Sequence, residues 1–154
     1  MKALLVVDVQ SEFANKTQMN LISAYIRYNS SEYARIFKTI FRNEENSSFF
    51  SVLNWDKCTN PKTDNSIYSH ETILKGTYGI PNRLIEKLKH YDSVDIIGCD
   101  IEACVLATCF QLFDAGIRFT VKTDLCFSSA DKLGSNYKLG AIRIMRNCFG
   151  KSIK

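Results

Sequence analysis

The sequence predicts an α/β fold of three layers, in which a central, mostly parallel sheet of Rossmann-like type lies between helices. Two observations lead to this prediction. Short apolar runs rich in β-branched residues, of the kind buried on both faces of a sheet, alternate with longer segments of helical period. The length of 154 residues also fits one compact unit. We therefore expect a single domain over residues 1–154.

The apolar runs and helical segments give the expected order of elements. Strands are expected at residues 4–7, 35–41, 51–55, 94–98 and 118–122, with a further short β-like run at 72–75. Helices are expected at residues 17–28, 81–91, 102–115 and 132–148. The third helix should pack on the sheet, because four of its apolar residues recur at spacings that share one face: Val105, Cys109, Leu112 and Phe113. The aromatic pair Phe49 and Phe50 is interpreted as core.

Composition argues against several classes of function. The formal net charge of +4 is too small to indicate a nucleic-acid-binding protein, and the C-terminal cations fall at spacings typical of a solvated helix face. No apolar run reaches membrane-spanning length, and Met1 and Lys2 lead directly into a predicted core strand instead of a signal sequence. We therefore expect a cytoplasmic protein that binds neither nucleic acid nor membrane.

The six cysteines are expected to be free thiols, because a chain of this length without a secretory signal belongs in a reducing compartment. No C-x-x-C motif occurs, and His70 and His90 lack partners at the spacing of metal ligands. The sequence therefore predicts no metal site and no cofactor.

Cys104 lies where a buried strand, a glycine turn and the start of a helix follow one another. The first turn of a helix presents unpaired N–H groups and the positive end of the macrodipole, and both favour a thiolate. A cysteine there can also be only a small apolar core residue. Asp8 and Lys75 favour the catalytic interpretation, since each ends a predicted strand and open α/β sheets gather their ligand-binding groups at strand ends.

The order of these three residues resembles the isochorismatase-like cysteine hydrolases, the family that includes nicotinamidases and N-carbamoylsarcosine amidase. The resemblance runs from about residue 4 to residue 149. Its most specific parts are the D-x-Q-x-x-F opening that begins at Asp8, the K-G pair at Lys75 and the G-x-x-x-x-x-C-V block that contains Cys104. A strand of the form A-G-I-R-F-T-V-K-T-D follows, as in the family.

This resemblance implies a hydrolase that cleaves a small amide-type C–N bond through a thioester. Cys104 would be the nucleophile, Asp8 the base and Lys75 the electrostatic partner, since a lysine within about 4–6 Å lowers the pKa of an acidic neighbour. The backbone N–H groups of Asp100 and Cys104 would hold the oxyanion. The resemblance also implies a cis peptide bond between Cys99 and Asp100.

The resemblance further implies a substrate pocket and indicates what the chain lacks. Phe13, Trp55 and Tyr78 could form the apolar walls of a pocket for a flat small-molecule substrate. Asn54 and Asp56 stand where metal-dependent nicotinamidases carry ligands, so the metal site is expected to be lost. The chain is shorter than most relatives, which suggests reduced loops and a homo-oligomer, a dimer or tetramer, whose neighbouring subunit completes the pocket.

Asp100 is the clearest departure from the family, where a small residue is usual. We favour the interpretation that it caps the helix, with its side chain accepting from the amide of Glu102 or Ala103. Alternatively, the carboxylate selects a cationic substrate or raises the pKa of the thiol. Two other functions stay open: vinyl-ether hydrolysis of the isochorismatase type, and a catalytically weakened member that serves as a binding or oligomeric scaffold.

Overall fold

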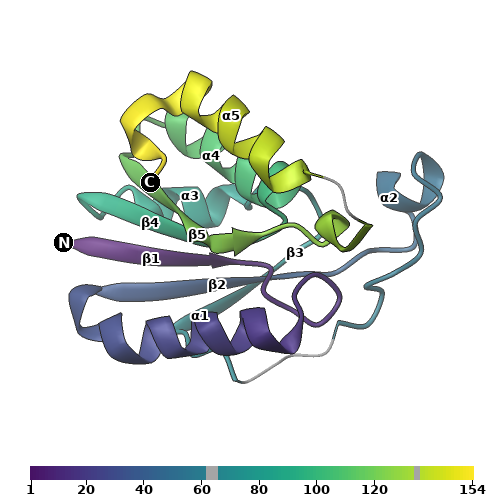
Figure 1. Ribbon diagram of the computed structural model, residues 1–154, viewed down its shortest axis with the longest axis horizontal. Coiled ribbons are helices and arrows are strands. Elements are labelled where there is room, and N and C mark those ends of the chain that lie inside the picture. Colours follow the sequence, from purple (N-terminus) through teal and green to yellow (C-terminus); the bar gives the residue numbers. More distant parts are fainter. Residues whose placement is uncertain (62–65, 134–135) are drawn as a thin grey trace.

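A five-stranded, all-parallel sheet forms the centre of the computed structural model, which describes residues 1–61, 66–133 and 136–154. The strand order is β3-β2-β1-β4-β5 (Figure 1). The strands are β1 (Lys2–Val7), β2 (Arg35–Phe41), β3 (Glu71–Lys75), β4 (Ser93–Cys99) and β5 (Phe119–Phe127). This arrangement confirms the predicted α/β fold with its parallel sheet.

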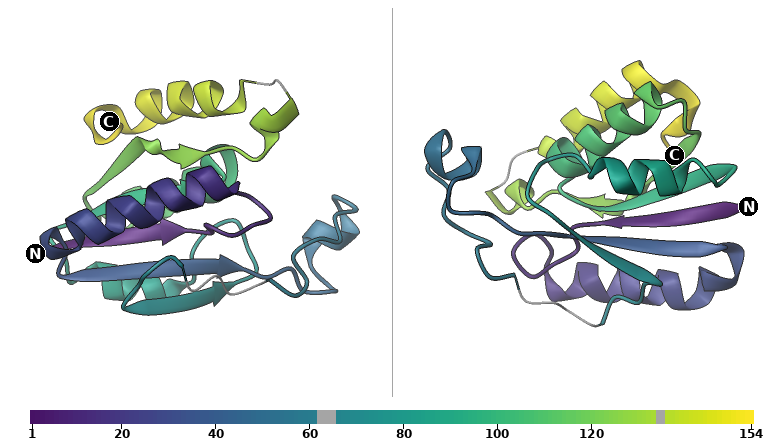
Figure 2. Two further views of the ribbon diagram at one scale, coloured as in Figure 1. Left: turned by 60° about the horizontal axis from the view of Figure 1, so that its bottom comes forward. Right: turned by 180° about the vertical axis from the view of Figure 1, so that it is seen from behind.

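Helices cover both faces of the sheet and make three layers (Figures 1 and 2). One face carries α1 (Lys16–Asn29), and the other carries α3 (Asn82–Leu88), α4 (Leu106–Asp114) and α5 (Tyr137–Phe149). The described part of the chain also contains five shorter helical segments: η1 (Ser30–Glu32), α2 (Ser48–Ser51), η2 (Ile101–Val105), η3 (Ala130–Leu133) and η4 (Gly150–Ser152). Among the described residues, no helix is both long and apolar enough to cross a membrane.

The central strand β1 shows why the core has two halves. Side chains of a strand alternate between its faces, so Leu4 and Val6 pack with α1 while Leu5 and Val7 pack with α3, α4 and α5. All four are fully buried. The run is apolar throughout because both faces of a parallel sheet are covered by helices.

Two parts of the sequence prediction need correction. Residues 51–55 do not form a strand: the short helix α2, capped by Ser47, ends at Ser51, and residues 52–55 follow as a turn and irregular chain. This segment stands apart from the sheet, beyond the carboxyl ends of the strands (Figure 1). The fourth predicted helix begins later, at Tyr137, since residues 130–133 form a separate turn. The third helix packs on the sheet as predicted, but Phe113 is 58% exposed.

Gly98 in β4 is the position where the fold most strictly requires glycine. Its φ is +130°, and a Cβ there would lie 2.1 Å from the carbonyl oxygen of Val7 in the neighbouring strand. We expect Gly98→Ala to destabilise the protein by about 3 kcal/mol or more, because backbone cannot move aside within the sheet. Urea unfolding measures the effect.

Gly140 in α5 is the matched control. A Cβ at this position meets no atom within 4 Å. Gly140→Ala should therefore raise the free energy of unfolding by about 0.5–1 kcal/mol, since alanine favours the helix. Equal destabilisation by both substitutions would contradict this account of Gly98.

Candidate active site

The three predicted catalytic residues meet at the carboxyl edge of the sheet. Asp8 follows β1, Lys75 ends β3, and Cys104 lies in the π-helical turn η2 that follows β4. Parallel strands end at the same edge, so residues 29 to 96 positions apart in sequence come together there. Asp8 leaves the strand with a positive φ of 47°, which turns the chain away from the sheet direction.

Asp8 and Lys75 form a buried ion pair. The Lys75 Nζ lies 2.7 Å from Asp8 Oδ2, and the two side chains are 1% and 0% exposed. The ammonium also donates to the carbonyl oxygens of Thr77, at 2.7 Å, and Tyr78, at 3.1 Å. These two hydrogen bonds and the ion pair together hold the cation in one position.

Thr39 in β2 completes the support of Asp8, and the sequence prediction missed it. Its hydroxyl donates to Asp8 Oδ1 at 2.7 Å and accepts from the Asp8 backbone N–H at 3.1 Å. Thr39 is fully buried on the strand between β1 and β3. A hydroxyl within the otherwise apolar end of β2 is the signal that could have identified it.

Gln10 explains part of the D-x-Q motif. Its side-chain amide donates to the Phe41 carbonyl at 3.1 Å and accepts from the Phe41 N–H at 2.7 Å. The amide thus makes the two bonds that another strand would make, beyond the end of β1. This fixes the loop after Asp8 against β2.

The Cys104 thiol lies within hydrogen-bonding reach of both the Asp8 carboxylate and the Lys75 ammonium. The residue is 7% exposed. Burial raises the pKa of the thiol well above its usual range, and the negative charge of Asp8 raises it further, while Lys75 opposes both effects. The expectation that position and charged partners favour a thiolate is therefore wrong in its net direction. The free site thus places a buried thiol beside the carboxylate of Asp8, which can accept its proton.

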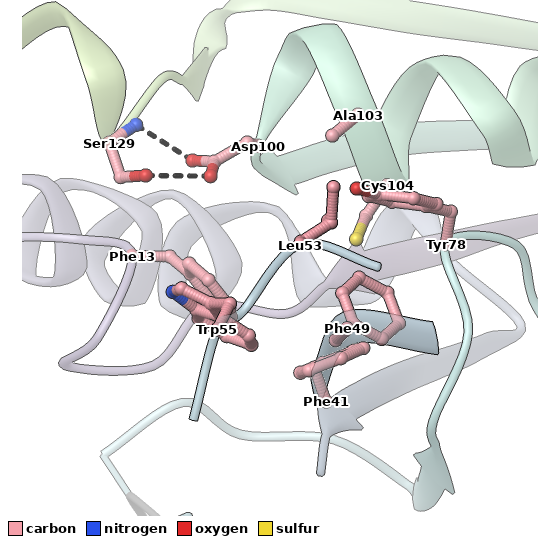
Figure 3. A pocket seen from close by; sticks show the side chains of 10 residues that line it. All are labelled: Phe13, Phe41, Phe49, Leu53, Trp55, Tyr78, Asp100, Ala103, Cys104 and Ser129. Atoms are coloured by element: carbon pink, nitrogen blue, oxygen red, sulfur yellow. Dashed lines mark hydrogen bonds between the residues drawn. The ribbon is translucent and has the colours of Figure 1, made fainter. Parts of the chain in front are cut away.

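An aromatic cavity of about 290 Å³ opens onto this thiol (Figure 3). It is lined by Phe13, Phe41, Phe49, Leu53, Trp55, Tyr78, Asp100, Ala103, Cys104 and Ser129. The three predicted pocket residues all take part, and Phe13 stacks on Trp55 with ring centroids 6.3 Å apart. Phe49, interpreted from sequence as core, is half-buried and lines the cavity instead.

Asp100 does not cap the helix as we expected from the sequence. Its two carboxylate oxygens accept from the backbone N–H and the hydroxyl of Ser129, both at 2.7 Å (Figure 3). The N–H groups of Ala103 and Val105 bond to the Asp100 carbonyl oxygen instead. The backbone carbonyl of Asp100 thus accepts the hydrogen bonds of this turn, and the carboxylate binds the segment after β5. The peptide bond between Cys99 and Asp100 is cis, as the family resemblance implied.

Burial raises the pKa of Asp100 to about 6, although the two bonds from Ser129 lower it. The negative charges of Glu102 and Asp8 add to the increase. At neutral pH the group is mostly ionised, and it lines the same cavity as Cys104.

Asn54 and Asp56 occupy the positions at which the family resemblance places metal ligands. Asn54 and Asp56 are both exposed, and neither lines the cavity. Among the described residues, no three histidine, cysteine, aspartate or glutamate side chains are grouped so that they could hold a metal ion. All six cysteines are free thiols, and Cys148 is the exposed one.

Comparison with solved structures shows the same fold in several hydrolases. The pyrazinamidase/nicotinamidase from Streptococcus mutans matches with a TM-score of 0.73 and 19% identity over 100% of both chains. The nicotinamidase from Bacillus subtilis matches with a TM-score of 0.74 and 13% identity, over 97% of this chain and 96% of that one. An isochorismatase-like hydrolase from Alkaliphilus metalliredigens gives 0.71 and 14%, over 93% and 91%. No protein-family model and no curated protein sequence matches the chain.

The raised pKa of Asp100 predicts a stability that depends on pH. Because the folded protein holds this proton more tightly than the unfolded chain, stability falls as pH rises through the interval from about 4 to 6. Asp100→Asn should therefore be more stable than the natural protein by about 1–3 kcal/mol at pH 8. This advantage should shrink as the pH falls from 6 toward 4. Unfolding in urea at pH 8, 6 and 4 measures it.

Asp124→Asn serves as its control, because it removes an exposed carboxylate of β5. It should change stability by less than about 0.5 kcal/mol at each pH. A stability advantage of Asp100→Asn that is the same at pH 4 and pH 8 would contradict the assigned pKa.

The charges around Cys104 predict opposite effects of its two partners on alkylation. In the natural protein the exposed Cys148 should react with iodoacetamide at pH 7 before the buried Cys104 does. Asp8→Asn removes a negative charge and should move the pH profile of Cys104 alkylation to lower pH, whereas Lys75→Met should move it to higher pH. Mass spectrometry of the two peptides gives both rates from one sample.

Cys148 provides the internal reference, since its modification should not change in either variant. Circular dichroism verifies that each variant is folded, because loss of one partner of a buried ion pair costs about 3–5 kcal/mol. Slower alkylation of Cys104 in Asp8→Asn would contradict the assignment of charges.

Proposed function

We propose that this chain is a cysteine hydrolase of the isochorismatase-like family that cleaves a small amide-type C–N bond. One observation carries the proposal: a buried Asp8–Lys75 ion pair within hydrogen-bonding reach of a thiol that faces an aromatic cavity. A buried ion pair is a poor device for stability alone. Beside a nucleophile it supplies a proton acceptor and a fixed positive charge.

In the first half of the reaction, Cys104 attacks the carbonyl carbon of the amide. The thiol proton moves to Asp8 as the C–S bond forms. Because Asp8 removes the proton during the attack, the reaction does not require a free thiolate despite the high pKa of the thiol. Asp8 then gives this proton to the nitrogen, the C–N bond breaks, and ammonia or an amine leaves. The acyl group stays on sulfur as a thioester.

In the second half, Asp8 accepts a proton from water, whose oxygen attacks the thioester carbonyl. The C–S bond breaks, the thiol regains the proton, and a carboxylic acid leaves. Lys75 keeps its position throughout, because it donates to the carbonyl oxygens of Thr77 and Tyr78. In each half the oxyanion would be held by the backbone N–H groups of Asp100 and Cys104.

The alternatives are less well supported. Vinyl-ether hydrolysis of the isochorismatase type needs no thiol nucleophile, yet the thiol of Cys104 lies beside the buried ion pair of Asp8 and Lys75. A binding or oligomeric scaffold would need neither the buried charges nor an open cavity at the thiol. The fold shared with solved nicotinamidases is consistent with amide hydrolysis.

A panel of small primary amides, assayed for ammonia release, tests this proposal. Cys104→Ala should reduce release at least about 10³-fold, because the covalent route is lost. Acid quenching of the natural protein during turnover should leave a mass increase equal to the acyl group on the Cys104 peptide. Cys148→Ser, the matched control at the exposed cysteine, should keep full activity. Activity that survives Cys104→Ala would overturn the mechanism.

A further inference from the structure

We propose that the cavity selects an amide that carries a positive charge, with Asp100 and the aromatic rings as the residues that recognise the cation. This inference rests on the proposed function, because it assigns a substrate class to the same site.

Asp100 is the only charged side chain among the ten described residues that line the cavity. The nearby Lys75 does not line it, and its ammonium is paired with Asp8 and donates to the carbonyl oxygens of Thr77 and Tyr78. Of the ion pairs formed by the described residues, none involves Asp100. The cavity therefore presents one uncompensated negative charge to whatever enters it.

Ser129 holds this charge in place without neutralising it. Each carboxylate oxygen accepts one hydrogen bond from Ser129, which leaves further lone pairs on both oxygens. Both residues line the cavity. A carboxylate fixed in this way, in a mostly apolar setting, gains most from a cationic ligand that restores neutrality.

Five aromatic rings form the rest of the wall: Phe13, Phe41, Phe49, Trp55 and Tyr78. They contact one another in a continuous cluster, with centroids 4.9 Å apart for Phe41 and Phe49 and also for Phe49 and Tyr78. The faces of such rings are negative and attract organic cations. In the view of Figure 3, Asp100 and Ser129 lie on one side of the cavity and Trp55, Phe13 and Phe49 on the other.

The position of the thiol sets the shape of the substrate. The carboxamide must reach the sulfur of Cys104, while the positive group lies between Asp100 and the rings (Figure 3). A cavity of about 290 Å³ is at the lower limit of ordinary ligand pockets. The substrate class is thus a compact cationic amide, with charge and amide a few bonds apart.

Two amides of equal shape test the charge preference. (Trimethylammonio)acetamide is a permanent cation, and 3,3-dimethylbutanamide replaces its nitrogen by carbon. Calorimetry on Cys104→Ala, which cannot turn the amides over, should show the cation binding at least about tenfold more tightly at pH 7.5. Adding Asp100→Asn to this variant should bring the two affinities within about threefold of each other.

Asp56→Asn is the matched control, since it removes an exposed carboxylate next to Trp55 that does not line the cavity. It should keep the preference for the cation. A second measurement needs no variant of Asp100. Burial, together with the negative charges of Glu102 and Asp8, raises the pKa of Asp100 to about 6, so the carboxylate gains a proton as pH falls from 7.5 to 5. The preference for the cation should weaken over this interval.

Equal binding of the two amides, tighter binding of the neutral one, or no binding of either would overturn the charge preference. Its failure is distinguishable from failure of the proposed function. If ammonia release and the acyl-Cys104 adduct appear with no preference for the cation, the hydrolase proposal stands alone. If the cation binds selectively but no amide is hydrolysed, the hydrolase proposal fails.

Discussion

The buried ion pair between Asp8 and Lys75 is the interaction on which this site depends. Its partners come from β1 and β3, which are separated in the sheet by β2, so the pair spans the end of the intervening strand. Thr39 of that strand lies beneath it and bonds to Asp8. Two charges without solvent need further polar partners, and the backbone carbonyls of the turn after β3 supply those of Lys75. The conformation of this turn and the position of the Lys75 charge therefore depend on each other.

The same pair explains how the two other functional groups behave. Asp8 and Lys75 carry opposite charges, so their effects on the pKa of the Cys104 thiol oppose each other. Burial is therefore the largest influence on that pKa. In the proposed reaction the nucleophile would therefore be generated during turnover and not stored as a thiolate. Among the described residues, Asp100 has no paired cation, so its charge faces the cavity. The proposed roles follow this difference: the paired carboxylate would act as the base, and the unpaired one would recognise the substrate.

The sequence was informative where function follows from strand ends and uninformative where it depends on distant partners. Asp8, Lys75 and Cys104 could be placed together because parallel strands end at one edge. The donors to Asp100 come from Ser129, 29 positions away, and short-range capping rules cannot include such a contact. Residues 49–55 combine aromatic and aliphatic side chains as a strand does, yet these side chains pack across the cavity and not in the sheet. Apolar side chains line the wall of a cavity as well as the interior of a sheet, so the residue types alone do not distinguish the two.

The site and its cavity wall belong to different parts of a fold that is shared with solved structures at 13–19% identity. The ion pair and the thiol are fixed by the ends of β1, β3 and β4, which belong to the sheet. Most of the cavity wall comes from segments outside it: Phe49, Leu53 and Trp55 from the connection between β2 and β3, and Ser129 from the connection after β5. Substitutions there change the shape and charge of the cavity without disturbing the sheet. In the proposed function the strand ends would thus fix the reaction, and the connections between the strands would fix the choice of substrate.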